Sequence, residues 1–184
     1  MWNGNNWHHV VIFTRDISAF VLVEIHFNLC ISTISSFTKS RPDLSSLLTN
    51  LLNFKVYSAF MLIEIGHGLD ARNLETTATL LPSGEFDLHT PTQEAAKAMP
   101  PATPLLRRPR IGIIFARLIM KHEDHGIKPF VVWLNDSINM REGITSYVLS
   151  TRPGTKPLDY SITSFDHVRL PLDALLSTLS KSKD

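Results

Sequence analysis

The sequence lacks the features that mark several common protein classes. Cys30 is the single cysteine among 184 residues, so no disulfide can close within the chain, and a reducing intracellular compartment fits best. The net charge is only +1, from 18 Lys and Arg against 17 Asp and Glu, which gives nucleic acid or an anionic membrane no strong field to follow. Neither a Gly-x-Ser-x-Gly nucleophile elbow nor a Gly-x-x-x-x-Gly-Lys phosphate loop occurs.

Uninterrupted hydrophobic runs are also scarce. The longest candidate, Ile17–Ile34, contains Glu24, His26 and Asn28, and polar groups in the middle of a membrane span are costly. No Lys or Arg precedes Arg15, so the positively charged start of a secretory signal is missing. We therefore expect neither a membrane span nor a secretory leader.

One stretch has a clear helical period. It follows Asp43, a plausible helix cap, and its leucines recur at intervals of three and four, at Leu44, Leu47, Leu48, Leu51 and Leu52. This spacing predicts a helix with one apolar face, which packs on a core or docks a partner.

Most of the remaining chain alternates like β-strands separated by turns. We expect short strands at 60–63, 76–80, 86–90, 111–120, 129–135, 144–150, 162–165 and 167–170. Five prolines in 91–110 indicate a connection without an element of its own, and the leucines of 172–179 suggest a last helix. About 100–200 residues suit one domain, so the prediction is a mainly β, antiparallel barrel-like or sandwich domain with short flanking helices.

The chain is organised around Phe60–Leu80. A strand-like run leads to Glu64 and then to Gly66-His67-Gly68, whose glycines permit positive φ or a close approach to a neighbouring strand or a ligand. The turn is the favoured interpretation, because Gly-x-Gly alone is a weak signal. Glu64 and Asp70 are candidate acid–base groups, but their spacing does not place them at one site.

Two other polar clusters are weaker candidates. His122 and His125 flank two carboxylates, but a metal centre needs three or four converging ligands, so a solvated hairpin turn is favoured. The basic run Arg107–Arg110 (RRPR) could attract a phosphate-bearing ligand, but a solvated loop is the favoured interpretation.

Read together, several segments resemble the flavin-dependent acyl-CoA dehydrogenases and acyl-CoA oxidases. The matching motifs are EIGHG at Glu64–Gly68, LETTAT at Leu74–Thr79, FDLHTPT at Phe86–Thr92, DHGIKPFVV at Asp124–Val132, GIT at Gly143–Thr145 and FDHVRLP at Phe165–Pro171. The resemblance implies that 57–176 is the family's barrel-like middle β domain, preceded by a poorly matching, partly helical segment at 1–56 and followed by a tail at 177–184.

The resemblance implies FAD as cofactor and the α,β-dehydrogenation of an acyl-CoA thioester, in fatty-acid β-oxidation or a specialised-metabolite pathway. A carboxylate removes the α-proton while the β-hydrogen leaves as hydride to the flavin. In the family this base lies in a helical domain that follows the middle domain, so no catalytic residue is assigned here. A homodimer or a partner that supplies the helical domain is expected.

The family's flavin contacts map onto Ile63, Glu64, Met99 and Pro101, and its acyl contacts onto Gly68 and Leu69. Ile63 stands where the family has Thr or Ser, and it has lost the hydroxyl donor. Pro101 stands where the family has Thr or Gly, and proline has no N–H to donate. These departures keep open an alternative, a truncated non-redox domain that binds acyl groups or acts as a scaffold.

The resemblance also implies a location. Oxidases of this family are often peroxisomal, but Ser182-Lys183-Asp184 ends in a charge where the peroxisomal Ser-Lys-Leu address has leucine. We therefore expect an intracellular protein without a recognisable targeting signal.

Overall fold

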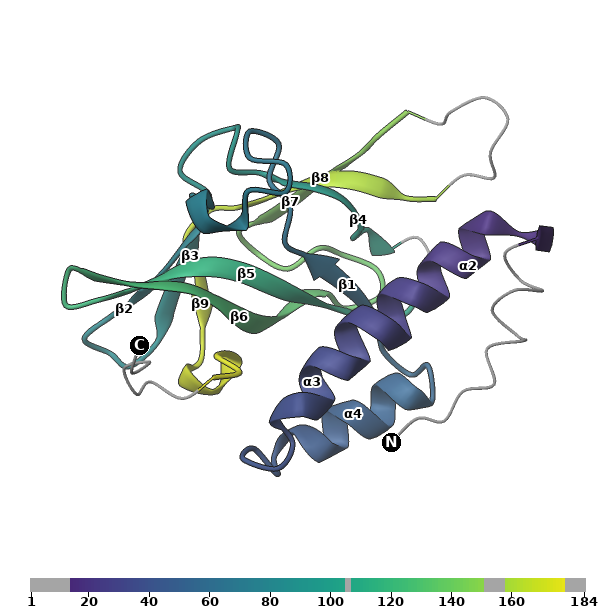
Figure 1. The fold of residues 1–184 in the computed structure, drawn as a ribbon, viewed down its shortest axis with the longest axis horizontal. Helices are drawn as coiled ribbons and strands as arrows, with labels where there is room; N and C mark the ends of the chain where they lie inside the picture. Colours follow the sequence, from purple (N-terminus) through teal and green to yellow (C-terminus); the bar gives the residue numbers. More distant parts are fainter. Residues whose placement is uncertain (1–13, 105–106, 151–157, 178–184) are drawn as a thin grey trace.

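The fold is mainly β, with a helical layer on one side (Figure 1). A computed structural model describes residues 14–104, 107–150 and 158–177. The strands of this part are β1 Tyr57–Met61, β2 Thr77–Leu80, β3 Phe86–His89, β4 Lys97–Pro101, β5 Arg110–Met120, β6 Glu123–Asn135, β7 Ile144–Val148, β8 Tyr160–Phe165 and β9 Val168–Leu170. The helices are α2 Ile17–Val23, the π-helical η1 Glu24–Ile31, α3 Ser32–Phe37, α4 Leu44–Leu52 and the short 3-10 turns η2 Ala71–Asn73 and η4 Leu172–Ala174.

Strand β5 is the centre of the larger sheet. It pairs along its length with β6 in an antiparallel hairpin, while its other edge pairs first with β1 and then with β2. Strands β3 and β9 extend this sheet beyond β2, and β4, β8 and β7 form a second, three-stranded sheet. The mainly β prediction is confirmed, but the sheet is mixed, because β1 and β2 run parallel to β5. Turn spacing alone predicted antiparallel neighbours and did not reveal these two crossovers.

Backbone hydrogen bonds join the two sheets into a curled half-barrel. Ala98 N donates to Ile63 O at 2.9 Å, which ties β4 to the end of β1. Thr90 N donates to Phe165 O at 2.8 Å, which ties the end of β3 to β8. The curled sheets enclose one apolar cluster that includes Ile114, Phe130 and Leu88.

The first half of β5 is buried on both faces. Ile111 and Ile113 point into a second apolar cluster beneath the helices, whereas Ile114 and Ala116 point into the half-barrel. This explains why the strand is a continuous apolar run and not an alternating one. Gly112 is needed there, because a Cβ would lie 2.7 Å from the Ile114 side chain.

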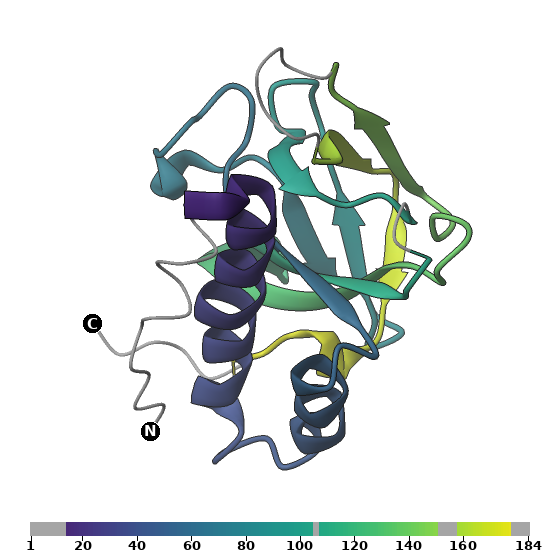
Figure 2. The same cartoon turned by 90° about the vertical axis from the view of Figure 1, so that its right-hand side faces the viewer.

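The helical layer covers one side of the sheet, with α2, η1 and α3 continuous and α4 beside them (Figures 1 and 2). Asp16 caps the first helix by accepting hydrogen bonds from the backbone N–H groups of Ser18 and Ala19 at 3.1 Å each. The predicted helix at 44–52 is confirmed, but the side chain of Asp43 makes no capping bond. It pairs instead with Arg41 at 2.6 Å.

The helix Ile17–Phe37 has 21 residues and is long and apolar enough to cross a membrane, by length and composition alone. The same test is passed by core helices of soluble proteins. Here Cys30 and Ile34 are fully buried against the domain. Burial also raises the pKa of the Cys30 thiol to about 12.

Three local predictions need correction. The segment 91–110 contains a strand, β4, whose prolines lie on a bulged stretch. The β5–β6 turn is confirmed, but it is only Lys121 and His122, both at positive φ, and β6 already begins at Glu123. The described part of 172–179 forms a single 3-10 turn, followed by an isolated bridge between Leu175 and Phe130.

Candidate functional site

A buried ion pair lies beneath the Gly-His-Gly loop. Glu64 and Lys97 are both 0% exposed, and Lys97 Nζ donates to Glu64 Oε1 at 3.0 Å. The same ammonium donates to the carbonyl of Phe115 at 2.7 Å, so it also anchors β5. The sequence points to this site only indirectly, because nothing in it marks Lys97 as buried.

The other half of the Glu64 carboxylate orders the loop. Its oxygens accept hydrogen bonds from the backbone N–H groups of Glu75 at 2.8 Å and Thr76 at 3.0 Å. Burial raises the pKa of Glu64, but the Lys97 charge and these hydrogen bonds outweigh it, so the pKa stays below the usual value. Burial lowers the pKa of Lys97, and Glu64 offsets part of that effect. The signature glutamate is therefore a structural anchor that connects β1, β2 and β4.

The glycines of the loop have different tasks. A Cβ on Gly66 would lie 2.7 Å from Glu94 Cβ, so this glycine permits close approach to the segment before β4. Gly68 has φ +53°, and no atom lies within 4 Å of where its Cβ would be. The favoured turn interpretation is confirmed, since Gly68 N donates back to Glu64 O at 3.1 Å.

Apolar side chains next to this charged anchor in the chain are exposed. Leu69 is 87% exposed, and Ile63, Ile65 and Met99 are exposed as well. The bond from Ala98 N to Ile63 O places Met99 close to Ile63, and Met99 has φ +67°, which non-glycine residues seldom adopt. We call Ile63, Ile65, Leu69 and Met99 the apolar platform.

The six residues predicted from the resemblance are divided by their burial. Ile63 and Met99 lie together on the platform, and Gly68 and Leu69 lie on the loop next to it. Glu64 faces inward, and Pro101 is buried in β4 opposite Tyr160. A ligand can therefore reach four of the six predicted residues, through a side chain or the backbone. They are Ile63, Gly68, Leu69 and Met99.

The structure does not bring the candidate acid–base groups Glu64 and Asp70 together as a pair. Asp70 is exposed and accepts a hydrogen bond from Asn73 at 2.7 Å, whereas Glu64 is enclosed, so the two carboxylates have different surroundings. His67 lies between two carboxylates, with Nδ1 at 3.1 Å from Glu64 and Nε2 at 3.4 Å from Glu75. Arg110 does not belong to a solvated loop, because it is buried and pairs with Asp159 at 3.0 Å.

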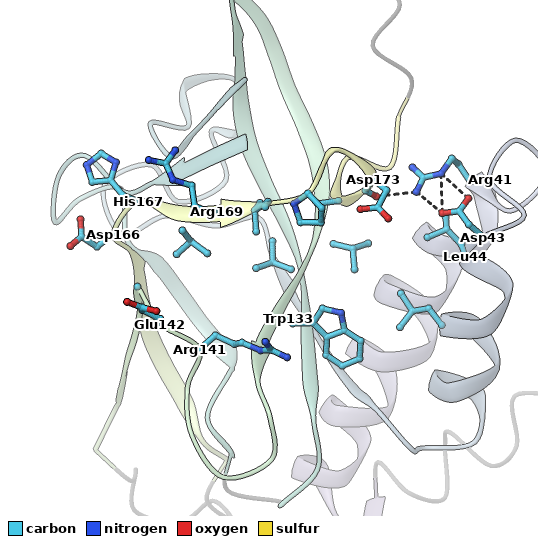
Figure 3. Close-up of a pocket in the computed structure, with 18 residues that line it drawn as sticks. Arg41, Asp43, Leu44, Trp133, Arg141, Glu142, Asp166, His167, Arg169 and Asp173 are labelled. Atoms are coloured by element: carbon cyan, nitrogen blue, oxygen red, sulfur yellow. Dashed lines mark hydrogen bonds and ion pairs between the residues drawn. The ribbon is translucent and has the colours of Figure 1, made fainter. Parts of the chain in front are cut away.

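A cavity of about 690 Å³ lies elsewhere, between α4, β6 and the β8–β9 segment. Figure 3 shows Asp166, His167 and Arg169 at one end and Arg41, Asp43 and Asp173 at the other. None of the six predicted residues lines it. Arg41 does not offer a free charge there, since it binds Asp43 and the carbonyl oxygens of Asp173 and Leu175.

Sequence reasoning missed the polar anchors that hold these surfaces. His26 donates from Nε2 to the carbonyl of Leu51 at 3.0 Å, so its Nδ1 accepts from the Ser58 hydroxyl at 2.7 Å. Asp159 binds Thr103 as well as Arg110. A polar residue inside an apolar run, as His26 is, was the available signal for such a buried contact.

A curled mixed half-barrel of this kind matches part of the solved structures of acyl-CoA oxidases. The acyl-CoA oxidase 1 of Yarrowia lipolytica superposes with a TM-score of 0.82 at 26% identity, over 97% of this chain and 26% of that structure. The peroxisomal acyl-coenzyme A oxidase 1 of Arabidopsis thaliana is 32% identical over 166 residues. The chain belongs to the acyl-CoA dehydrogenase and oxidase family.

The chain spans about a quarter of the length of the relatives it matches, 24% for the Arabidopsis enzyme, which in turn covers 86% of this chain. No protein-family model matches it. The acyl-CoA oxidase-2 of Caenorhabditis elegans, solved with FAD, ascaroside-CoA and ATP, superposes with a TM-score of 0.67 at 26% identity, over 85% of this chain and 24% of that one. FAD is the cofactor of the family.

Proposed function

We propose that this chain contributes the flavin- and acyl-binding β domain, residues 57–176, of an FAD-dependent acyl-CoA oxidoreductase. The reaction is the α,β-dehydrogenation of an acyl-CoA thioester. The observation that carries the proposal is the apolar platform, with Leu69 87% exposed on the loop that the buried Glu64–Lys97 pair anchors. An exposed apolar surface on an immobile base suits a flat ring and an acyl chain.

The residues present fit FAD through packing more than through polar contacts. Ile63 and Met99 offer apolar atoms to the ring. Pro101 has no N–H and is buried, so it supports β4 and offers the flavin no donor. The missing hydroxyl at Ile63 costs one hydrogen bond, which is worth about 0.5–1.5 kcal/mol net. We expect FAD affinity to be lowered roughly tenfold, or less, by this departure.

When bound, FAD supplies the two-electron acceptor for this dehydrogenation. The chain's own residues bind and orient. Glu64 and Lys97 fix the loop, Gly68 lets it turn, and Leu69 excludes water from the acyl side. Glu64 is not the base in this proposal, because its carboxylate is enclosed and engaged by Lys97 and two backbone donors. A carboxylate from another segment or a second chain removes the α-proton.

We further propose that the domain works in a homodimer, or with a partner that supplies the helical domain of the family. Peroxisomal residence follows from the same proposal, because two Arabidopsis relatives are named peroxisomal acyl-coenzyme A oxidases. The helix Ile17–Phe37 docks on the domain and does not span a membrane in this proposal. His26, in its middle, is buried and hydrogen-bonded to Ser58 and Leu51.

The test is flavin retention. The purified chain is incubated with FAD, free cofactor is removed, and the absorbance spectrum is recorded. We expect a retained flavin band at about one per chain or per dimer. Met99→Asp places a charge on the platform and should abolish retention, whereas Tyr147→Asp, at an exposed apolar position on β7, should not. Circular dichroism verifies that both variants fold.

A folded chain that retains no flavin would reject the redox role of this chain. Ile63 and Pro101, which lack the family's donors, favour the alternative in that case, a non-redox domain that binds acyl groups. Binding of an acyl-CoA thioester, measured by calorimetry without FAD, would then distinguish an acyl-binding domain from a scaffold.

A further inference from the structure

A second cluster of functional side chains lies away from the apolar platform. His89 ends β3, and Asp166 and His167 form the turn between β8 and β9. One ligand atom from each of these three residues lies within 4.8 Å of the others. Asp166 and His167 line one end of the cavity in Figure 3.

The two imidazoles are held next to each other by the sheet. Their rings stack with centroids 4.1 Å apart and an interplanar angle of 12°. The pairing of β3 with β9 fixes this arrangement, since Leu88 lies opposite Val168, and the two histidines are the residues next to that pair. The histidine that ends β3 and the histidine of the β8–β9 turn therefore meet through the pairing of β3 with β9.

A hydrogen bond to Asp87 determines which ring nitrogen of His167 can bind a metal ion. Its Nδ1 lies 2.9 Å from Asp87 Oδ2, and because a carboxylate only accepts, Nδ1 carries the proton. The lone pair is then on Nε2. A carboxylate that orients an imidazole in this way is the usual support for a metal-binding histidine.

His89 provides a nitrogen that the described residues leave without a partner. Its Nδ1 is enclosed and has no hydrogen-bond partner in that part of the chain, and the nearest carboxylate oxygen, Asp166 Oδ1, lies 3.8 Å away. Asp87 Oδ1 is likewise enclosed without a partner. Enclosed polar atoms without partners are costly, and a cation coordinated by His89 and Asp166 would satisfy the His89 nitrogen.

We propose that His89, Asp166 and His167 bind a divalent transition-metal ion, with Asp87 as the positioning residue for His167. Two imidazoles and one carboxylate suit Zn²⁺, Co²⁺ or Ni²⁺ rather than Mg²⁺ or Ca²⁺. Three protein ligands leave a fourth position open. In a tetrahedral zinc site, nitrogen ligands lie about 3.3 Å apart, as follows from Zn–N bonds of about 2.0–2.1 Å. Asp166 is 84% exposed and can rotate toward the two imidazoles, while His167 stays bound to Asp87.

Bound metal would cross-link β3 to the β8–β9 turn at the rim of the cavity. This inference is independent of the flavin proposal, because none of the four residues belongs to the apolar platform. The site can therefore exist whether or not the chain retains FAD.

The test uses the full chain without a histidine tag, freed of metal by chelation. Co²⁺ is titrated and the visible absorption bands are recorded, and Zn²⁺ binding is then measured by calorimetry. We expect one ion per chain, with Zn²⁺ displacing Co²⁺. His89→Gln and His167→Gln should each weaken binding at least tenfold. Asp87→Asn should weaken it about 10- to 100-fold and shift the Co²⁺ bands.

The matched control is the double variant His122→Gln/His125→Gln on the β5–β6 hairpin, which removes the exposed histidine of another turn and a partly exposed histidine of β6. It should bind as the unmodified chain does. The proposal would be overturned if the His122→Gln/His125→Gln variant lost metal binding. It would also be overturned if His89→Gln and His167→Gln both bound the metal as tightly as the unmodified chain. Asp166 and His167 lie on an exposed turn, whereas Asp87 and His89 are partly buried in β3, so circular dichroism separates loss of ligands from loss of fold.

Discussion

Two regions of the molecule follow opposite rules of burial, the sheet face beneath the helices and the Gly-His-Gly loop with its apolar platform. Beneath the helices, most buried side chains are apolar, such as Cys30, Ile34 and Leu51, with His26 as a hydrogen-bonded exception. At the apolar platform the order is reversed, because the charged pair Glu64 and Lys97 is 0% exposed while Leu69 is 87% exposed.

The stability of the fold explains the burial pattern beneath the helices, but it does not explain the pattern at the apolar platform. Burial of Ile34 and Leu51 removes apolar surface from water, at about 25 cal/mol per Å², and needs no further reason. A buried ion pair seldom stabilises a fold more than apolar residues of the same size would, and an exposed leucine contributes little. The reversed arrangement is therefore best explained by a surface kept rigid for a ligand.

The largest expected effect comes from breaking the buried pair. Lys97→Ala leaves the Glu64 carboxylate enclosed without its cation and also removes the donor to the Phe115 carbonyl. We expect the free energy of unfolding to fall by about 3–5 kcal/mol. Urea denaturation monitored by circular dichroism measures this loss.

The control for that change removes both charges. Glu64→Gln/Lys97→Met keeps an acceptor for one of the two backbone donors, Glu75 N or Thr76 N, and fills the lysine's space with an apolar chain. We expect it to recover a large part of the stability that Lys97→Ala loses. A double variant as unstable as the single one would show that the pair stabilises the fold directly.

The next largest loss of stability is expected beneath the helices, at Leu51 of α4. Leu51→Ala removes a fully buried side chain of α4 and leaves a cavity against the sheet, so we expect a loss of about 2–5 kcal/mol in urea denaturation. Leu52→Ala, one residue further and half exposed, should change stability by about 0.5 kcal/mol or less. Equal losses in the two variants would contradict the packing described for α4.

Local patterns predicted the elements that alternate or recur, and failed where partners come from elsewhere in the chain. The helix at 44–52 and most strands follow from spacing alone. Strand β4 was missed because Pro100 and Pro101 argue against a strand, and its edge position and bulge tolerate them. The parallel pairing of β1 and β2 with β5 depends on crossovers that turn signals do not encode.

The candidate site was predicted in outline by the motif resemblance, without the roles of its residues. The EIGHG motif located the loop, but only the structure places Glu64 inward on Lys97, a residue 33 positions away. Burial of a lysine depends on packing from several strands, so no local pattern predicts it. His89 and His167 are 78 residues apart in sequence and meet only through the pairing of β3 with β9.

A smaller effect depends on pH and involves His26 in the helical layer. Burial lowers the pKa of His26, and the nearby charge of Arg110 lowers it further. The hydrogen bond from His26 to the Leu51 carbonyl raises the pKa, but the net shift is downward. Below about pH 6.5 the unfolded chain takes up a proton that the folded chain refuses. Stability is therefore full above that pH and falls as the pH drops toward the folded-state value.

His26→Gln should make this pH dependence flatter. The free energy of unfolding of both chains is measured in urea at pH 7 and pH 5, and the difference between the two chains isolates His26 from the other titrating groups. A drop between these pH values that is identical in the variant would assign the pH dependence to other residues.

The smallest effect on stability is expected at the platform itself, at Leu69. Because this side chain is 87% exposed, Leu69→Ser should change the free energy of unfolding by about 0.5 kcal/mol or less. If the leucine is covered by an acyl chain on binding, the lost burial is worth about 1.5–3 kcal/mol, so the affinity for an acyl-CoA thioester should fall at least about tenfold. Calorimetric titration measures that affinity, and Tyr147→Ser on β7 is the matched exposed control. An affinity that falls equally in both variants, or in neither, would remove Leu69 from the binding surface and leave the reversed burial at the platform without its proposed cause.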